Sequence, residues 1–132
     1  MLSAFITTSV NAEELINTTI YHPAYAPGET LQMEMVLQNP VKDPQTKDIT
    51  LTKDNVKVAI TPFIRKIEED RFFLFFNFPL TMQEGPYILA IRNIPFIVNN
   101  TLKEISHTDL ITITKEPHII SVFPGIIDLR SS

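Results

Sequence analysis

The chain has 132 residues, the usual size of one domain and too short for two independent hydrophobic cores. Its net charge of -4 and pI near 5.3 leave no basic excess to neutralise phosphates, so nucleic acid is not expected as a partner. Cysteine is absent, which excludes disulfides, thiolate metal sites and cysteine nucleophiles. Eighteen Ile, fourteen Thr and ten Pro, against three Gly, favour strands over helices.

Residues 1–12 are a short apolar stretch that ends in Val10-Asn11-Ala12, a small-x-small pattern like a signal-peptidase site. We interpret them as a signal remnant or an N-terminal strand. No run of about 18 apolar residues occurs, so no transmembrane helix is predicted.

The first half of the chain alternates in the manner of strands. Residues 15–21 are a strand candidate, and a corner at Pro27-Gly28 leads into residues 31–37, where apolar and polar side chains alternate. Two further segments, 49–52 and 56–60, flank Asp54-Asn55, a pair suited to a two-residue hairpin turn.

The second half adds more strands. Phe63 to Ile67 is followed by the unbroken apolar run Phe72 to Phe78, which needs cover on both faces. Segments 87–92, 95–98 and 109–114 complete the set, with a hairpin tip at Asn99-Asn100. The fold class expected is all-β, an immunoglobulin-like two-sheet antiparallel sandwich of seven to eight strands.

The domain organisation expected is a sandwich over residues 13–116. Residues 117–132 resume an apolar, strand-like pattern after Lys115-Glu116-Pro117. This tail is interpreted as either the last strand of the sandwich or the start of a truncated following domain.

The corner Tyr25-Ala-Pro-Gly-Glu with its following strand, the run Phe72 to Pro79, and Glu84-Gly-Pro-Tyr-Ile-Leu resemble immunoglobulin-like and fibronectin-type-III-like modules of large cell-surface proteins, those of archaea in particular. The resemblance covers roughly residues 15–114 and implies adhesion, spacing or assembly, at an extracellular address. It also makes Tyr87 a candidate tyrosine corner, the alternative being a half-buried strand tyrosine.

Tests for chemistry find no catalytic, cofactor or metal site. There is no Gly-x-Ser-x-Gly elbow, and three Gly cannot supply a phosphate-binding loop. His107 and Asp109 would share a strand face, but two exposed polar residues are the preferred interpretation. The acidic run of residues 68–70 is interpreted as a solvated hairpin tip rather than a calcium site.

Two kinds of surface site are expected instead. Asn17 and Asn99 begin N-x-Thr sequons and are candidate glycosylation sites in a secreted chain, with Asn99 favoured because it lies at a predicted turn. Phe73 and Phe75 should point away from Leu74 and Phe76, so they are candidate interface residues.

The function expected is a non-catalytic, extracellular structural or adhesive module whose partners are neighbouring domains or proteins, including a further copy of itself. One alternative is a filament or surface-layer subunit that assembles by β-strand addition of its terminal segments. Another is an accessory or carbohydrate-binding domain of a secreted enzyme, with Tyr21, Tyr25 and surface Phe residues as aromatic platforms.

Overall fold

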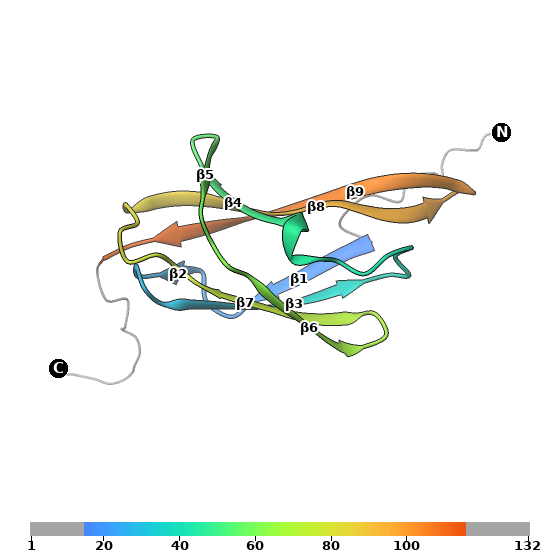
Figure 1. Cartoon of the computed structure of the whole chain (residues 1–132), viewed down its shortest axis with the longest axis horizontal. Coiled ribbons are helices and arrows are strands. Elements are labelled where there is room, and N and C mark those ends of the chain that lie inside the picture. The colour runs from blue at the N-terminus through green and yellow to red at the C-terminus, as the bar shows by residue number, and fades with distance from the viewer. Residues whose placement is uncertain (1–14, 116–132) are drawn as a thin grey trace.

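Two facing sheets make up the computed structural model, which describes residues 15–115 (Figure 1). The segments 1–12 and 117–132, for which two interpretations each were given above, lie outside the described residues. The four-stranded sheet has, in spatial order, β1 (Ile16–Ile20), β3 (Thr30–Leu37), β7 (Arg71–Asn77) and β6 (Phe63–Glu68). The five-stranded sheet has, in order, β2 (Ala24–Tyr25), β9 (Thr101–Ile113), β8 (Gly85–Val98), β4 (Ile49–Lys53) and β5 (Val56–Val58).

Without the short strands β2 and β5, seven strands remain. The first, second, fifth and fourth of these (β1, β3, β7 and β6) form one sheet, and the third, sixth and seventh (β4, β8 and β9) form the other. This is the strand order of immunoglobulin-type sandwiches. The prediction of an all-β, two-sheet sandwich is therefore confirmed. A single turn of 3-10 helix, η2 (Thr46–Asp48), precedes β4.

Two details of the prediction were wrong. The described residues form nine strands rather than seven to eight, and β2 pairs with β9 in parallel rather than antiparallel. Both differences arise because the chain leaves the four-stranded sheet after β1 and joins the other sheet at Ala24. The corner before Gly28 therefore contains a short strand of its own.

The core lies between the inner faces of the two sheets. On β3 the alternation seen in the sequence buries every second side chain, from Leu31 to Leu37, with no exposed surface. Among residues 15–115 no polar or charged residue is buried. The largest fully buried side chains are Phe72, Phe76, Phe78, Phe96, Ile16, Leu31, Met33, Met35, Leu37, Leu51, Leu74 and Leu89.

The two predicted hairpin turns, at Asp54-Asn55 and Asn99-Asn100, are present. Asp54 and Asn55 have φ of 53° and 67°, and Asn99 and Asn100 have φ of 52° and 62°. Positive φ at both central residues is what a type I′ hairpin turn requires, and Asn and Asp tolerate it better than other side chains. These turns join β4 to β5 and β8 to β9.

The β8–β9 hairpin is longer than the sequence indicated. The predicted segments 87–92 and 95–98 form one strand, because an irregularity in the pairing between Ile91 and Ile94 accommodates the break. Asn93 at this point has φ of 59°. Strand β9 begins at Thr101 rather than near residue 109, since the polar stretch after the turn is held by pairing with β8. In Figure 1 this hairpin reaches beyond the four-stranded sheet at one end of the molecule.

Candidate functional site

A row of aromatic side chains lies on the outer face of the four-stranded sheet. Strand β7 alternates, so Phe72, Leu74 and Phe76 enter the core while Phe73 and Phe75 point outward, as predicted. Tyr21 adds a ring beside Phe73, and Phe63 adds one beside Phe75. We call Tyr21, Phe73, Phe75 and Phe63 the aromatic row.

The rings of the aromatic row are in continuous contact. The centroids of Tyr21 and Phe73 are 6.2 Å apart, those of Phe73 and Phe75 are 5.8 Å apart, and those of Phe63 and Phe75 are 5.3 Å apart. Phe63 and Phe75 are stacked with 18° between their planes, since they are cross-strand partners on β6 and β7. Tyr21 and Phe63, at the two ends, are 49% and 55% exposed.

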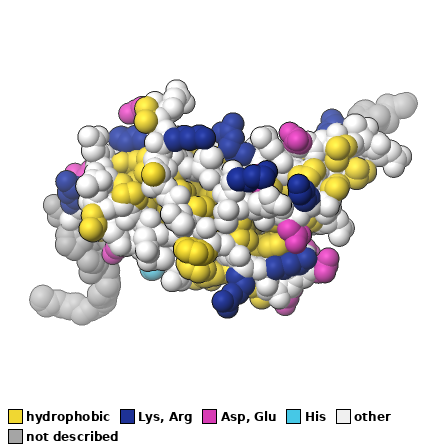
Figure 2. Space-filling view, viewed as in Figure 1, with side chains coloured by type: hydrophobic (Ala, Val, Ile, Leu, Met, Phe, Trp, Pro, Cys, Tyr) yellow, Lys and Arg dark blue, Asp and Glu magenta, His cyan; other side chains and the backbone are white. Residues whose placement is uncertain are grey.

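Charged groups border the aromatic row. The Arg71 guanidinium donates to the Glu34 carboxylate over 2.7 Å, and Arg65 is the cross-strand partner of Phe73. An apolar centre with a polar rim is the usual composition of a surface that binds another protein. In Figure 2 hydrophobic side chains reach the surface over β6 and β7, with basic and acidic side chains beside them.

The structure thus brings the two predicted interface residues, Phe73 and Phe75, together with Tyr21, which was named above as an aromatic platform, and with Phe63, which was not singled out. Both were placed in predicted strands, 15–21 and 63–67, but no local signal in the sequence shows which strand lies beside which. Tyr25, named above as an aromatic platform, is only 2% exposed and packs against Phe78 at 5.2 Å, so that expectation was wrong. Its position next to β9 buries it.

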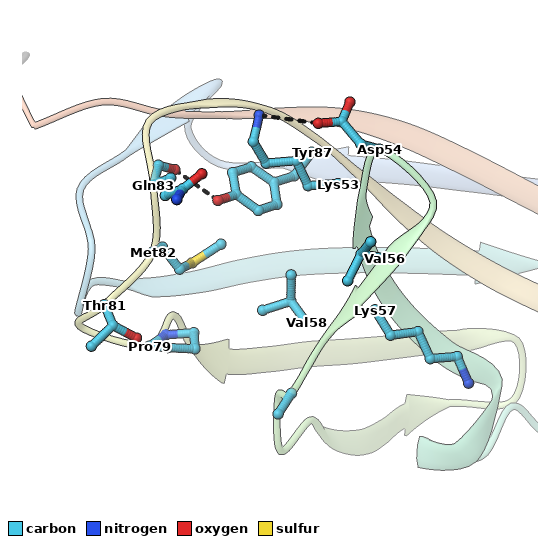
Figure 3. A pocket seen from close by; sticks show the side chains of 11 residues that line it. Lys53, Asp54, Val56, Lys57, Val58, Pro79, Thr81, Met82, Gln83 and Tyr87 are labelled. Atoms are coloured by element: carbon cyan, nitrogen blue, oxygen red, sulfur yellow. Dashed lines mark hydrogen bonds and ion pairs between the residues drawn. The ribbon is translucent and has the colours of Figure 1, made fainter.

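Two hollows lie beside the segment that joins β5 to β6. One, of about 620 Å³, is bordered by Phe63, Phe75, Ile60 and Leu80, and therefore adjoins the aromatic row. The other, of about 560 Å³, lies between the β4–β5 hairpin and the loop before β8 (Figure 3). Both are lined by Ala59 and Pro79, so they meet at this segment.

Tyr87 stands in the second hollow and forms a tyrosine corner. Its hydroxyl donates a hydrogen bond to the Gln83 carbonyl oxygen over 2.7 Å, shown as a dashed line in Figure 3. A tyrosine near the start of the penultimate strand that bonds backbone a few residues upstream is a hallmark of immunoglobulin-type sandwiches. The Lys53 ammonium lies 5.4 Å from the centre of the Tyr87 ring. This prediction is confirmed, and the residues serve to fix the corner.

His107 and Asp109 share the inner side of β9, where they meet Thr18 of β1. The Thr18 hydroxyl donates to the Asp109 carboxylate over 2.9 Å, and the His107 Nε2 lies 3.0 Å from the same hydroxyl and 3.2 Å from the carboxylate. Since the hydroxyl proton points to Asp109, Nε2 acts as the donor. These bonds link β1 to β9 and are a structural contact. The His107 and Asp109 side chains are only 15% and 23% exposed, so the interpretation of two exposed residues was wrong.

Two of the three acidic residues of the β6–β7 turn lie near basic side chains. Glu68 lies 3.6 Å from Arg71, and Glu69 lies 3.9 Å from Lys66, all at exposed positions. In the region from Leu15 to Lys115, no cluster of three or more His, Asp or Glu side chains is placed to hold a metal ion.

Both sequon asparagines are exposed. Asn99 is in the turn at the tip of the β8–β9 hairpin, and the Thr101 hydroxyl bonds its carbonyl over 3.4 Å. Asn17 is on β1 opposite Val36, so it lies on the same outer face as the aromatic row. Attachment of a glycan to either residue stays a prediction.

Tyr25 provides a pH-dependent test of the packing under β2. Burial raises the pKa of the Tyr25 hydroxyl. The nearby backbone of His22 and Gln32 acts in the opposite direction and lowers the pKa, although neither forms a well-aligned hydrogen bond with the hydroxyl. The unfolded chain releases this proton at about pH 10. The contribution of this hydroxyl to the free energy of unfolding is therefore fully present below about pH 10, and it is lost as the pH rises from there through the raised pKa.

We expect Tyr25→Phe to reduce this alkaline loss. The measurement is the urea midpoint of unfolding at about pH 8 and about pH 11, with Tyr21→Phe as the control at an exposed site. An equal alkaline loss in Tyr25→Phe and the native chain would show that another group causes it.

The fold and the aromatic row together define the class of this protein, an immunoglobulin-type β-sandwich with an exposed aromatic face. No family model matches the sequence, and a search of curated proteins finds no match. The structure is similar to that of a DUF4785 family protein from Legionella pneumophila, with 10% sequence identity and a TM-score of 0.53. The alignment covers 74% of this chain but only 28% of the Legionella chain. At this identity the similarity concerns the fold alone.

No helix in the described region is long and apolar enough to cross a membrane.

Proposed function

We propose that this chain is a non-catalytic structural or adhesive module of an extracellular surface protein, and that the aromatic row is its contact surface for a neighbouring domain or protein. The observation that carries this proposal is the unbroken contact of four rings on an outer face, two of them about half exposed. Exposed aromatic clusters with a charged rim are enriched at protein contacts.

The rest of the sandwich supports a scaffold role. Its interior is filled by apolar side chains, and among the described residues the buried side-chain polar atoms without a hydrogen-bond partner are the Tyr25 hydroxyl and Thr50 Oγ1. Many cell-surface domains use the immunoglobulin-type arrangement, which is the basis for the proposed extracellular location. Exposed apolar surface in contiguous form marks sites of interaction.

A second candidate is a carbohydrate-binding module. The specific observation in its favour is that two aromatic residues, Tyr21 and Phe63, are about half exposed beside a polar rim, as exposed aromatic platforms for sugars require. The two candidates differ in their ligand, since one requires a protein surface and the other a glycan. A glycan array with the purified chain separates them.

Bead attachment tests the adhesive proposal. Beads coated with the native chain should attach to a layer of cells of the organism that produces this protein. Beads coated with the double variant Tyr21→Ser/Phe63→Ser should attach at a level about tenfold lower, because both exposed ends of the aromatic row are lost. The matched control is Val41→Ser/Val56→Ser, which removes two side chains of similar exposure elsewhere on the surface.

Circular dichroism confirms that each variant is folded before it is used. Failure of the native beads to attach would overturn the adhesive role, and equal attachment of native and Tyr21→Ser/Phe63→Ser beads would remove the aromatic row from it. Binding to the glycan array that is lost in Tyr21→Ser/Phe63→Ser would favour the carbohydrate module.

A further inference from the structure

Strand β9 has a long unpaired edge. On one side it pairs with β8 along its whole length, and on the other side it pairs with β2 at Thr112 and Ile113. Within the described part of the chain no strand covers that second side from Thr101 to Ile111. An edge of this length presents a row of backbone donors and acceptors that can pair with another strand.

The direction of the free backbone groups follows from the contacts with β2. The amides of Thr112 and Thr114 donate across this edge to the carbonyls of Pro23 and Tyr25, over 3.4 Å and 2.8 Å. Because alternate residues of a strand point their backbone groups to the same side, residues 102, 104, 106, 108 and 110 also face the open edge.

The exposed apolar side chains of this hairpin form two pairs. Ile97 and Leu102 are cross-strand partners near its tip and are 58% and 60% exposed. Ile88 and Leu110 are cross-strand partners further along and are 40% and 63% exposed. All four lie on the outer face of the five-stranded sheet, since their neighbours Leu89, Phe96 and Ile111 are buried. Figure 2 shows hydrophobic side chains at the tip of this hairpin.

We propose that two copies of this chain pair antiparallel through β9, around a two-fold axis at Ser106. In this register Leu102 of one copy lies opposite Leu110 of the other, and the two sets of backbone groups at residues 102 to 110 meet as hydrogen-bonded pairs. The two five-stranded sheets then form one continuous sheet.

This register is the one in which the edge is complementary to itself. Each Leu102–Leu110 contact joins the two apolar pairs into one row across four strands, from Ile97 of one copy to Ile88 of the other. Lys103 lies opposite Asp109, which places opposite charges together. Moving the axis by one residue to either side would place Leu102 against Thr108, or Leu110 against Glu104.

The free edge of β9 is centred on the residue of the proposed two-fold axis, Ser106. It begins at Thr101, after the hairpin turn, and ends at Ile111, before β2 covers the strand. Ser106 lies midway between them. Each copy's hairpin tip therefore ends where β2 of the other copy begins, so the pairing uses the whole free edge. A two-fold contact of this kind closes on itself and yields a dimer rather than a filament.

Cysteine crosslinking tests the axis directly, because the native chain contains no cysteine. In the proposed dimer the two Ser106 Cα atoms are about 5.5 Å apart, within the range for a disulfide. Ser106→Cys should crosslink under mild oxidation. Glu104→Cys, also exposed and on the same edge, is the matched control, since its copies are separated by about 13 Å along the strand.

Charge pairing tests the register. Leu102→Lys and Leu110→Glu should each raise the dimer dissociation constant by about tenfold or more, because each places an unpaired charge in the apolar row. The double variant Leu102→Lys/Leu110→Glu should recover much of the affinity, since the introduced ammonium of one copy then meets the introduced carboxylate of the other. Sedimentation equilibrium of the full chain measures these constants, and circular dichroism verifies folding.

The proposal fails if the native chain is monomeric at all concentrations up to about 1 mM. It also fails if Glu104→Cys crosslinks as readily as Ser106→Cys, or if the double variant dissociates more than either single variant. This inference does not depend on the aromatic row, which lies on the other sheet. Loss of bead attachment in Tyr21→Ser/Phe63→Ser with an unchanged dimer constant would distinguish the two surfaces.

Discussion

Phe76→Ala is expected to lower the free energy of unfolding by about 3–5 kcal/mol, the range for loss of a buried aromatic ring with a residual cavity. Phe76 is 1% exposed and packs edge-on against Phe78 at 5.2 Å. The cavity left by the substitution would be lined by apolar side chains, because the core around Phe76 is apolar. Urea denaturation monitored by circular dichroism gives the difference.

The matched control is Phe75→Ala, the same substitution one residue earlier on the same strand. Phe75 points outward and stacks on Phe63, so it gives up only part of its surface on folding. We expect a loss of about 1–2 kcal/mol. Equal losses for the two variants would contradict the assignment of inner and outer faces on β7.

Met33→Lys is expected to cost about 4 kcal/mol or more, which would leave a marginally stable domain largely unfolded. Met33 has no exposed surface and lies between Ile20 of β1 and Leu74 of β7. An ammonium group there would have no counter-ion, because the core contains no charged residue in the region described. Loss of a cooperative thermal transition is the expected observation.

Gln32→Lys is the control for this substitution. Gln32 is exposed on the outer side of β3 opposite Phe75, so a lysine can keep its ammonium in water. Its effect should stay within about 1 kcal/mol. A folded Met33→Lys variant with native stability would mean that the register of β3 against the core differs from the one described.

The two proposed surfaces have different consequences for assembly. The aromatic row lies on the four-stranded sheet, where a partner would lie against a face, whereas the β9 edge extends the five-stranded sheet sideways. A closed β9 dimer would present two aromatic rows, one from each copy. Such an arrangement would allow bivalent attachment, in which the second contact is strengthened by the first.

The β9 dimer also differs from the filament alternative derived from the sequence. That alternative requires a terminal segment to be added to a neighbouring sheet, and the segments in question lie outside the described residues. The β9 contact uses described residues and pairs like with like. Deletion of residues 1–12 should therefore leave the β9 dimer constant unchanged, while it would abolish a filament that depends on those residues.

The sequence by itself determined most of the strands and both hairpin turns, but not β2 or the full length of β9. The alternation from Leu31 to Leu37, the outward position of Phe73 and Phe75, and the turns at Asp54-Asn55 and Asn99-Asn100 were all predicted and are present. Each depends on local physics, namely the two-residue period of a strand and the tolerance of Asn and Asp for positive φ. Local rules can be applied without knowledge of which strands are neighbours.

The tertiary structure alone decided which side chains meet. Tyr21 joins Phe73 because β1 lies beside β3, and Phe63 joins Phe75 because β6 and β7 pair in one particular register. The parallel pairing of β2 with β9 likewise follows from the crossing between sheets, and it sets the length of the free β9 edge. Contacts between residues distant in sequence depend on the packing of the whole sandwich, which has no local pattern to record it.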